Sequence, residues 1–381
     1  MMMPRHSSES SVHSESATVS GVSDVDELAR HFRNQGITMV ERAPFSAEIC
    51  AAVAEHPEII ELLLAAPDEQ QIPVLLLAAI HDQVLGDPDC ELASWYPTVS
   101  TSPRNDAVEG ALVRHCRTHT DHLRHTIGTR STQTNEVGRC GLFVPALGLL
   151  DAEVGPLALI DIGTSAGLNL RLDQYEYHYQ PGGSVGDPST VRLETGTRGS
   201  PPIPAALPTI SGRFGLDREP VDLSDPASAR WLTACIWPEQ ADRFRRLSAA
   251  IAIALEHPVH VRQGDAVDDL AETIHAADAV AHPVVLNSWV LNYLSAERRD
   301  AYVAELERIG AEDDISWVYA ESPAQCSGLP FPEEIAGDHV TALMLVTWRR
   351  GRRTVDYLGR AHPHGYWLHW AGRPHGGAAA R

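Results

Sequence analysis

The stretch Leu157–Asn169 constrains the fold of this chain more than any other part of it. Its first residues, Leu157–Ile160, are apolar, Asp161 follows them, and small residues then fill most positions up to Gly167. This order is typical of a buried strand that runs through a tight loop into the start of a helix. Because Gly163 and Gly167 lack a Cβ, such a loop can bring its backbone close to a ligand. The amides of a first helical turn would then favour an anionic group.

Two chemistries share this pattern of residues. Read as Asp161-x-Gly163-x-Ser165-x-Gly167, the loop is a nucleotide-type cofactor site. Read as Gly163-x-Ser165-x-Gly167, it is the nucleophile elbow of a serine hydrolase. A dinucleotide site would need G-x-G-x-x-G, but Ser165 replaces the middle glycine and the last glycine comes one position early, which disfavours NAD and FAD. The sequence also contains no Gly-Lys-Ser/Thr phosphate loop.

Length and charge limit the partners of this protein. The chain has 381 residues, which suits two domains. Its 30 basic and 51 acidic residues give a net charge of 30 − 51 = −21, which repels nucleic acid and anionic membrane surfaces and leaves small molecules as the expected partners. The six cysteines form no C-x-x-C pair and the apolar runs are too short to span a bilayer, so we expect a cytoplasmic protein without a zinc site or a disulfide framework.

The pattern of residues divides the chain into three parts. Residues 1–22 are polar and of low complexity, and we expect them to form a disordered tail. Residues 23–150 show helical periodicity interrupted by prolines, which predicts short helices around an apolar core. Residues 151–381 alternate apolar strands with helices, and residues 180–208 interrupt them as an irregular, Pro- and Gly-rich insertion. We therefore predict an N-terminal helical region followed by an α/β domain with a doubly wound, Rossmann-like sheet.

The predicted strands place polar residues at one edge of this sheet. The expected strands cover residues 157–160, 209–214, 259–262, 284–286 and 315–320, and a long closing hairpin covers residues 342–370. The polar residues that follow the five parallel strands are Asp161, Asp217, Asp265, Asn287 and Glu321. An open parallel sheet binds its ligand along the carboxyl edge of its strands, so these side chains mark the predicted binding site.

This arrangement resembles the class I S-adenosylmethionine-dependent methyltransferases, whose first motif is a strand, an acidic residue and a loop of glycines and other small residues. The resemblance implies that Asp161, Gly163, Ser165 and Gly167 form the loop on the methionine side of the cofactor. It further implies that Asp217 holds the ribose hydroxyls, that Asp265 lies beside the adenine, and that residues 287–289 face the methyl acceptor. The closing hairpin is similar to the last two strands of that fold.

A second resemblance covers nearly the whole chain, and further motifs carry it. They are Gln133–Arg139, Gly186–Pro188, Trp237–Gln240, Gly264–Ala266 and His362–Gly365, in addition to Gly163–Leu170. Together they are similar to the bacterial family of unknown function DUF2332. That family supplies no firm activity, so the resemblance supports a methyltransferase-like fold more than it supports methyl transfer.

The predicted function is methyl transfer from S-adenosylmethionine to a small-molecule acceptor, with the helical region as a lid. Glu136, Asn287 and His364 are the candidate catalytic residues for orienting the acceptor or removing a proton. For Glu136 an alternative interpretation is a buried salt bridge that joins the domains. The sequence does not indicate the acceptor or the oligomeric state.

Two alternatives belong to other classes of protein. In a serine hydrolase Ser165 would be the nucleophile, with an acid and a histidine such as Asp338 and His364 in the required order. The polar residue Asp161 and the lack of a preceding His-Gly-Gly segment count against this interpretation. The second alternative is a non-catalytic ligand-binding relative, which would bind no cofactor.

A histidine pattern in the helical region raises the question of a metal site. His115, His119 and His122 follow at i, i+4 and i+7 and share one helix face. No carboxylate or cysteine completes an obvious ligand set, and Arg114, Arg117 and Arg124 lie nearby in the sequence. We therefore interpret these histidines as a solvated polar face and predict no metal.

Overall fold

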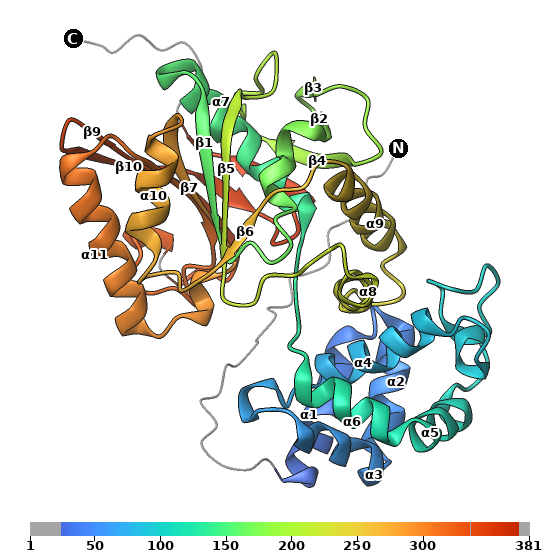
Figure 1. Cartoon of the computed structure of the whole chain (residues 1–381). Coiled ribbons are helices and arrows are strands. Elements are labelled where there is room, and N and C mark those ends of the chain that lie inside the picture. Colours follow the sequence, from blue (N-terminus) through green and yellow to red (C-terminus); the bar gives the residue numbers. More distant parts are fainter. Residues whose placement is uncertain (1–23, 336, 373–381) are drawn as a thin grey trace. The chain divides into compact units, whose positions relative to one another are not determined.

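The computed structural model of the chain describes residues 24–335 and 337–372, and the expected disordered tail lies outside these ranges. Two compact units divide the described residues, and Figure 1 labels their elements. The helical unit comprises residues 24–132 together with 234–241, and the α/β unit comprises residues 133–233 together with 242–372. The chain therefore passes between the units three times, after residues 132, 233 and 241.

Short helices build the N-terminal part of the helical unit, as the proline pattern predicted. They are α1 (Val25–Met39), α2 (Pro44–Ala54), α3 (Pro57–Ile60), α4 (Pro73–Gly86), α5 (Glu109–Thr118) and α6 (Thr120–Thr129), with the 3-10 helices η1 (Glu61–Ala65), η2 (Asp68–Gln70) and η3 (Glu91–Trp95). Pro44, Pro57 and Pro73 each stand at the beginning of a helix. A proline is tolerated there because the missing N–H would have had no partner within the helix.

Residues 234–241 complete the helical unit from a distant part of the sequence. The Glu239 carboxylate accepts hydrogen bonds from the backbone N–H and the hydroxyl of Ser46, at 2.6 and 2.7 Å, in the first turn of α2. His81 on α4 contacts the Ala234 carbonyl through Nδ1 at 3.0 Å and the Thr98 hydroxyl through Nε2 at 2.9 Å. Both ring nitrogens of this buried histidine therefore have partners, and one partner comes from residue 234.

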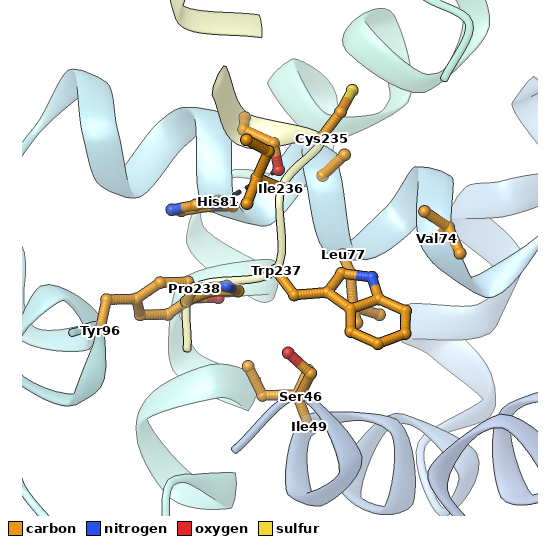
Figure 2. A pocket seen from close by; sticks show the side chains of 12 residues that line it. Ser46, Ile49, Val74, Leu77, His81, Tyr96, Cys235, Ile236, Trp237 and Pro238 are labelled. Carbon is orange, nitrogen blue, oxygen red and sulfur yellow. Dashed lines mark hydrogen bonds between the residues drawn. The ribbon is translucent and has the colours of Figure 1, made fainter. Parts of the chain in front are cut away.

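A small cavity marks where this segment packs. Figure 2 shows the backbone of residues 235–238 passing His81 and Tyr96, whose rings are stacked with their centroids 5.3 Å apart. The cavity holds only about 10 Å³, which is room for one water molecule at most. The motif Trp237–Gln240 therefore fills the interior of the helical unit and leaves no space there for a larger ligand.

One sheet of eleven strands organises the α/β unit. The strands are β1 (Leu157–Ile162), β2 (Glu176–Gln180), β3 (Gly183–Val185), β4 (Arg192–Arg198), β5 (Ile210–Asp217), β6 (Val261–Gln263), β7 (His282–Ser288), β8 (Ser316–Glu321), β9 (Thr341–Arg349), β10 (Arg352–Ala361) and β11 (Trp367–Trp370). Their order is β3-β2-β4-β11-β10-β9-β8-β7-β1-β5-β6. The helices are α7 (Cys140–Val154), α8 (Pro226–Ala234), α9 (Ala241–Glu256), α10 (Leu270–Asp278) and α11 (Ala296–Glu312), with η4 (Val137–Arg139), η5 (Asn169–Gln174), η6 (Leu291–Tyr293) and η7 (Glu333–Ile335).

The order of the parallel strands fixes where a ligand would bind. Strands β6, β5, β1, β7 and β8 are neighbours in that order, and all four pairs between them are parallel. Along the chain the strands are added first on one side of β1 and then on the other, so the order reverses between β1 and β7 (Figure 1). Open α/β sheets bind ligands outside the carboxyl ends of the strands at this reversal. The predicted α/β sheet and its antiparallel closing hairpin, β9–β10, are therefore present.

The sequence prediction was wrong for the insertion at residues 180–208. This segment contains β3 and β4, which together with β2 extend the sheet beyond β11. Leu193, Thr195 and Thr197 are buried and alternate with more exposed residues along β4, a strand pattern that the Pro- and Gly-rich flanks obscured. The partner strand β11 lies about 170 residues later in the chain, so no local signal indicated the pairing.

The prediction of a helix after the glycine loop was also wrong. The loop leads into η5, a 3-10 helix of six residues whose backbone is non-helical at Arg171 (φ −107°, ψ 21°), and then directly into β2. This short, interrupted 3-10 helix aligns fewer peptide dipoles than the α-helix that the sequence predicted, so it offers a weaker partial positive charge to an anionic group. In addition, α7 contacts β1, β4 and β8, and the α/β unit therefore begins at Gln133 and not at residue 151.

Candidate functional site

The loop after β1 has the strained backbone that its sequence suggested, but its own chain fills the freed space. Gly163, Ser165 and Gly167 have φ values of 72°, 54° and 69°, in the left-handed region that non-glycine residues rarely adopt. A Cβ on Gly163 would lie 2.1 Å from Cγ2 of Val290, and one on Gly167 would lie 3.0 Å from Cγ2 of Val261. The expectation that these glycines leave room for a ligand is thus corrected, because two valine side chains occupy that room.

The backbone amides of this loop are also committed within the chain. Gly163 N donates to the Leu216 carbonyl at 2.8 Å, and Gly167 N donates to the Thr164 carbonyl at 2.9 Å. Ser165 N donates to Oδ2 of Asp217 at 2.7 Å. The loop therefore links β1 to β5 through hydrogen bonds, and three of its amides are not available to an anionic group.

Asp217 lies at the end of β5, where the resemblance placed the ribose-binding carboxylate. Its Oδ2 accepts the hydrogen bond from Ser165, and its Oδ1 accepts one from the backbone N–H of Glu219 at 2.8 Å. The side chain is only partly buried. A carboxylate has about four acceptor positions, so two remain free to accept hydrogen bonds from two hydroxyl groups.

Asp161 stabilises the loop after β1 by accepting a hydrogen bond from one of its residues. The side chain is 3% exposed, and Oδ2 accepts a hydrogen bond from the Thr164 hydroxyl at 2.6 Å. Burial raises the pKa of Asp161 to about 7; the nearby charge of Asp217 also raises it, while the hydrogen bond from Thr164 opposes the shift. A protonated or hydrogen-bonded carboxyl at this buried position stabilises the loop.

Asp265 follows β6 and caps the turn that leads into α10. Its Oδ1 accepts hydrogen bonds from the backbone N–H groups of Val267 at 2.8 Å and Asp268 at 3.2 Å, and it pairs with Arg298. Burial alone would raise the pKa of Asp265, but the two N–H groups and the Arg298 charge outweigh it and lower that pKa. An adenine amine would have to use Oδ2, which lies 3.8 Å from Nη2 of Arg218.

The segment Gln133–Arg139 runs across the loop after β1. Oε1 of Gln133 accepts a hydrogen bond from the Ser165 hydroxyl at 2.9 Å, and Nδ2 of Asn135 donates to the Thr164 carbonyl at 2.8 Å. Oδ1 of Asn135 is buried and has no hydrogen-bond partner within the described ranges. This motif is therefore part of the candidate site and lies next to the glycine loop.

The same segment continues to the loop after β7 and to the motif His362–Gly365. Arg139 is buried and donates from Nη1 to the Ser288 carbonyl at 2.7 Å and from Nε to the Pro363 carbonyl at 2.8 Å. Burial lowers the pKa of Arg139. A Cβ on Gly365, whose φ is 77°, would lie 2.0 Å from the Gly138 carbonyl oxygen. Two glycines therefore let the motifs pack backbone against backbone.

This contact brings together two of the predicted catalytic residues, Glu136 and His364. Oε2 of Glu136 lies 3.4 Å from Nδ1 of His364 and 2.6 Å from Nε of Arg243 on α9, and Oε1 lies 3.8 Å from Nη2 of Arg246. Burial would raise the pKa of Glu136, but contact with His364 and the two arginine charges hold it well below its usual range. Burial lowers the pKa of His364, and Glu136 opposes this shift only in part. Sequence reasoning missed both arginines, which follow the Trp237–Gln240 motif closely.

Asn287, the third predicted catalytic residue, belongs to the core and not to this cluster. Its Oδ1 accepts hydrogen bonds from the Tyr302 hydroxyl at 3.0 Å and from Nε1 of Trp317 at 2.6 Å. The side chain is fully buried between β7, β8 and α11. Its Oδ1 therefore stabilises aromatic residues, while Nδ2 is buried without a hydrogen-bond partner among the described residues, and a catalytic role for Asn287 stays a prediction.

The residues of the alternative serine hydrolase have other partners. The Ser165 hydroxyl donates to Gln133, the carboxylate of Asp338 pairs with Arg360 at 2.6 Å, and His364 contacts Glu136. The described residues contain no hydrogen bond between any two members of this triad.

His115, His119 and His122, which lie in or between α5 and α6, have different surroundings. His115 is buried and contacts Oε1 of Gln83 through Nε2 at 2.9 Å, and Nδ1 of His119 contacts the His115 carbonyl at 2.9 Å. The interpretation of a solvated face was therefore wrong for His115. Across residues 24–335 and 337–372, no three His, Cys, Asp or Glu side chains are grouped to hold a metal ion, and no helix is both long and apolar enough to cross a bilayer.

The fold and these contacts define an α/β protein with a mostly parallel sheet and a helical unit. The chain belongs to the family described as "Uncharacterized protein conserved in bacteria (DUF2332)", whose sequence model matches residues 29–370. The match covers both units, as the motifs in the sequence indicated. Neither the curated proteins nor the solved structures contain a match to the chain.

Proposed function

We propose that the α/β unit binds S-adenosylmethionine and transfers its methyl group to a small-molecule acceptor. The observation that carries the proposal is the Asp217 carboxylate at the end of β5, joined through Ser165 N to the loop at the reversal of strand order. The order β6-β5-β1-β7-β8 also supports a doubly wound site of this kind.

The residues of the site fit the nucleoside half of this cofactor better than its methionine half. Asp217 keeps two acceptor positions for the ribose hydroxyls. The amides of Gly163, Ser165 and Gly167 do not fit a methionine carboxylate, because they already donate within the chain. The unpartnered Oδ1 of Asn135 is suited to accept a hydrogen bond from the ammonium group of the cofactor.

His364 is the residue best placed to remove a proton from the acceptor. Nδ1 faces the ionised Glu136, which favours the tautomer with a proton on Nδ1 and leaves the lone pair on Nε2. The imidazole is about one third exposed, and burial lowers its pKa, so it is neutral near pH 7. When bound, the cofactor would supply an activated methyl group, while His364 would take the proton and Glu136 would orient the ring.

Calorimetry with S-adenosylmethionine and S-adenosylhomocysteine tests this proposal. We expect both to bind the full chain, and Asp217→Asn to weaken binding about tenfold or more, since it removes a charged acceptor. Asp222→Asn, which changes an exposed carboxylate five residues later, is the matched control and should leave binding unchanged. His364→Asn should reduce turnover while binding persists. The proposal fails if the unmodified protein binds neither compound.

One observation favours a second candidate function. Ser165 is a non-glycine residue with φ 54° inside Gly-x-Ser-x-Gly, which is the strained backbone of a nucleophile elbow. Treatment with a fluorophosphonate distinguishes this hydrolase from the methyltransferase. Labelling that disappears in Ser165→Ala would favour the hydrolase, and we expect none because the hydroxyl contacts Gln133 and no imidazole.

A further inference from the structure

The α/β unit contains a cavity that the proposed methyl transfer does not use. It has a volume of about 350 Å³, within the range of small-molecule sites, and lies between η5, the end of α9, the segment after β5 and the start of β6. Its walls include Ala166, Arg171, Val221, Leu223, Leu255 and Val259. The six residues of η5 cover less of the sheet than a longer α-helix would, and the cavity adjoins this short element.

Arg171 places a buried positive charge at this cavity. The side chain is 2% exposed, and it donates to the carbonyls of His257 at 2.9 Å, Gly167 at 2.7 Å and Ala254 at 3.5 Å. These partners are neutral. No carboxylate of the described residues lies within ion-pair distance of this guanidinium.

The neighbouring charges do not neutralise Arg171. The acidic side chain closest in sequence, Asp173, pairs with Arg213. Asp222 also lines the cavity, but its side chain is exposed and Oδ1 accepts hydrogen bonds from the backbone and hydroxyl of Ser224. A charge buried without a counter-ion is costly, so an anion in the cavity would be stabilised by this guanidinium.

We propose that this cavity is a second ligand site, which binds a small organic anion with an apolar body. The carboxylate or phosphate of the ligand would pair with Arg171, and its hydrocarbon part would contact Val221, Leu223 and Val259. An arginine suits this position better than a lysine would, because its planar guanidinium can make a bidentate contact with either head group.

The site is separate from the predicted nucleoside-binding carboxylates. Asp217 and Asp265 are not among the residues that line the cavity. The cavity nevertheless adjoins the glycine loop, because Arg171 bonds the Gly167 carbonyl and Val221 N bonds the Ser165 carbonyl at 3.2 Å. Because the two sites use different residues, ligand binding at Arg171 does not depend on the proposed methyl transfer.

Calorimetry on the full chain with hexanoate, hexyl phosphate and 1-hexanol tests the proposal. We expect at least one of the two anions to bind about tenfold or more tightly than the neutral alcohol, and the stronger of the two identifies the head group. Arg171→Gln removes the charge, retains an amide that can donate to at most two of the three carbonyls, and should weaken anion binding by a similar factor. Arg308→Gln, an exposed arginine on α11, is the control and should change nothing.

A second variant keeps the test decisive if Arg171→Gln does not fold. Leu223→Trp narrows the cavity without changing Arg171 and should also weaken anion binding. Equal binding of the anions and the alcohol, or unchanged anion binding in either folded variant, would overturn the proposal. Absence of S-adenosylmethionine binding would leave this result unaffected.

Discussion

The two units differ in the ionisable groups that they bury. The helical unit buries imidazoles, and burial lowers the pKa of His81 and of His115 to about 4. The α/β unit buries carboxyl groups, and burial raises the pKa of Asp161 and of Glu321 to about 7. Glu321 accepts hydrogen bonds from the backbone N–H groups of Val290 and Leu291. The α/β unit also contains a partly buried imidazole, His282, whose pKa burial lowers to about 4, so only the buried neutral carboxyls distinguish it from the helical unit.

This difference predicts opposite effects of pH. A histidine with a lowered pKa contributes stability that is complete above its unfolded pKa of about 6.5 and is lost as pH falls towards 4. A carboxyl with a raised pKa contributes stability that is complete below its unfolded pKa of about 4 and is lost as pH rises through 7. The α/β unit also contains Glu136, whose lowered pKa acts in the opposite direction, so single variants are needed to separate the groups.

The largest expected effect tests whether the stability of the α/β unit depends on the close backbone contact between Gly365 and Gly138. Gly365→Ala places a Cβ 2.0 Å from the Gly138 carbonyl and should destabilise this unit by about 4 kcal/mol or more. Gly155→Ala is the matched control, because Gly155 has φ 80° and ψ −155° and no atom within 4 Å of the added Cβ, so only about 1–3 kcal/mol of backbone strain applies. Hydrogen exchange read by mass spectrometry in both units measures the effects. Equal losses in the two variants would contradict the predicted clash.

The second prediction concerns acid sensitivity of the helical unit. Between pH 7 and pH 4 protonation of His81 should cost the unmodified unit about 3 kcal/mol of stability, in addition to the contribution of His115. His81→Gln removes one of these two titrating groups and should reduce the acid loss by about 3 kcal/mol, although it lowers stability at pH 7. Exchange of the α4 amides, corrected for its intrinsic pH dependence, is the measurement. The exposed His31→Gln should retain the full acid effect, and an equally large acid loss in His81→Gln would refute the assignment.

The third prediction concerns the opposite slope in the α/β unit. Asp161→Asn keeps an acceptor for the Thr164 hydroxyl and cannot ionise. Its stability relative to the unmodified protein should therefore increase by about 3 kcal/mol between pH 5 and pH 8. Exchange of the β1 amides across this range reports the difference. Asp278→Asn on α10 is exposed and serves as the control. A constant difference between the two pH values would show that Asp161 does not titrate there.

The smallest effect sharpens the role of the segment at residues 234–241. Glu239→Gln removes the charge that accepts two hydrogen bonds from Ser46 at the beginning of α2, and should cost about 1 kcal/mol. Exchange of the α2 amides should increase while that of β1 stays unchanged. Gln240→Ala, one residue later, tests whether any change in this segment has the same effect; a loss equal to that of Glu239→Gln would contradict the specific cap.

The sequence predicted the sheet of the α/β unit better than its binding residues. Apolar runs such as Leu157–Ile160 are buried on both faces, so they could be recognised as strands without their neighbours. Strand β4 could not, because its pairing with β11 is distant in sequence and its polar face resembles a loop. Local pattern therefore indicated the parallel strands β6, β5, β1, β7 and β8 and missed β2, β3 and β4 at the other end of the sheet.

The site shows the same limit at the level of side chains. Position at the end of a strand was known for Asn287, but only tertiary packing shows that its amide points to Tyr302 and Trp317. Glu136 and His364 were found because both lie in dense polar motifs, while Arg171 carries no motif signal and is identified only by its missing counter-ion. Burial and the choice of partner, which decide the chemistry, are not properties of a short stretch of sequence.

Because the chain passes between the units three times, the helical unit is encoded by two separate stretches of the gene. A gene fragment that ended at Thr132 would encode helices whose His81 lacks the Ala234 carbonyl and whose α2 lacks the Glu239 carboxylate. A contiguous piece of the gene therefore cannot encode the complete helical unit without part of the α/β unit, and the family match from residue 29 to residue 370 includes both.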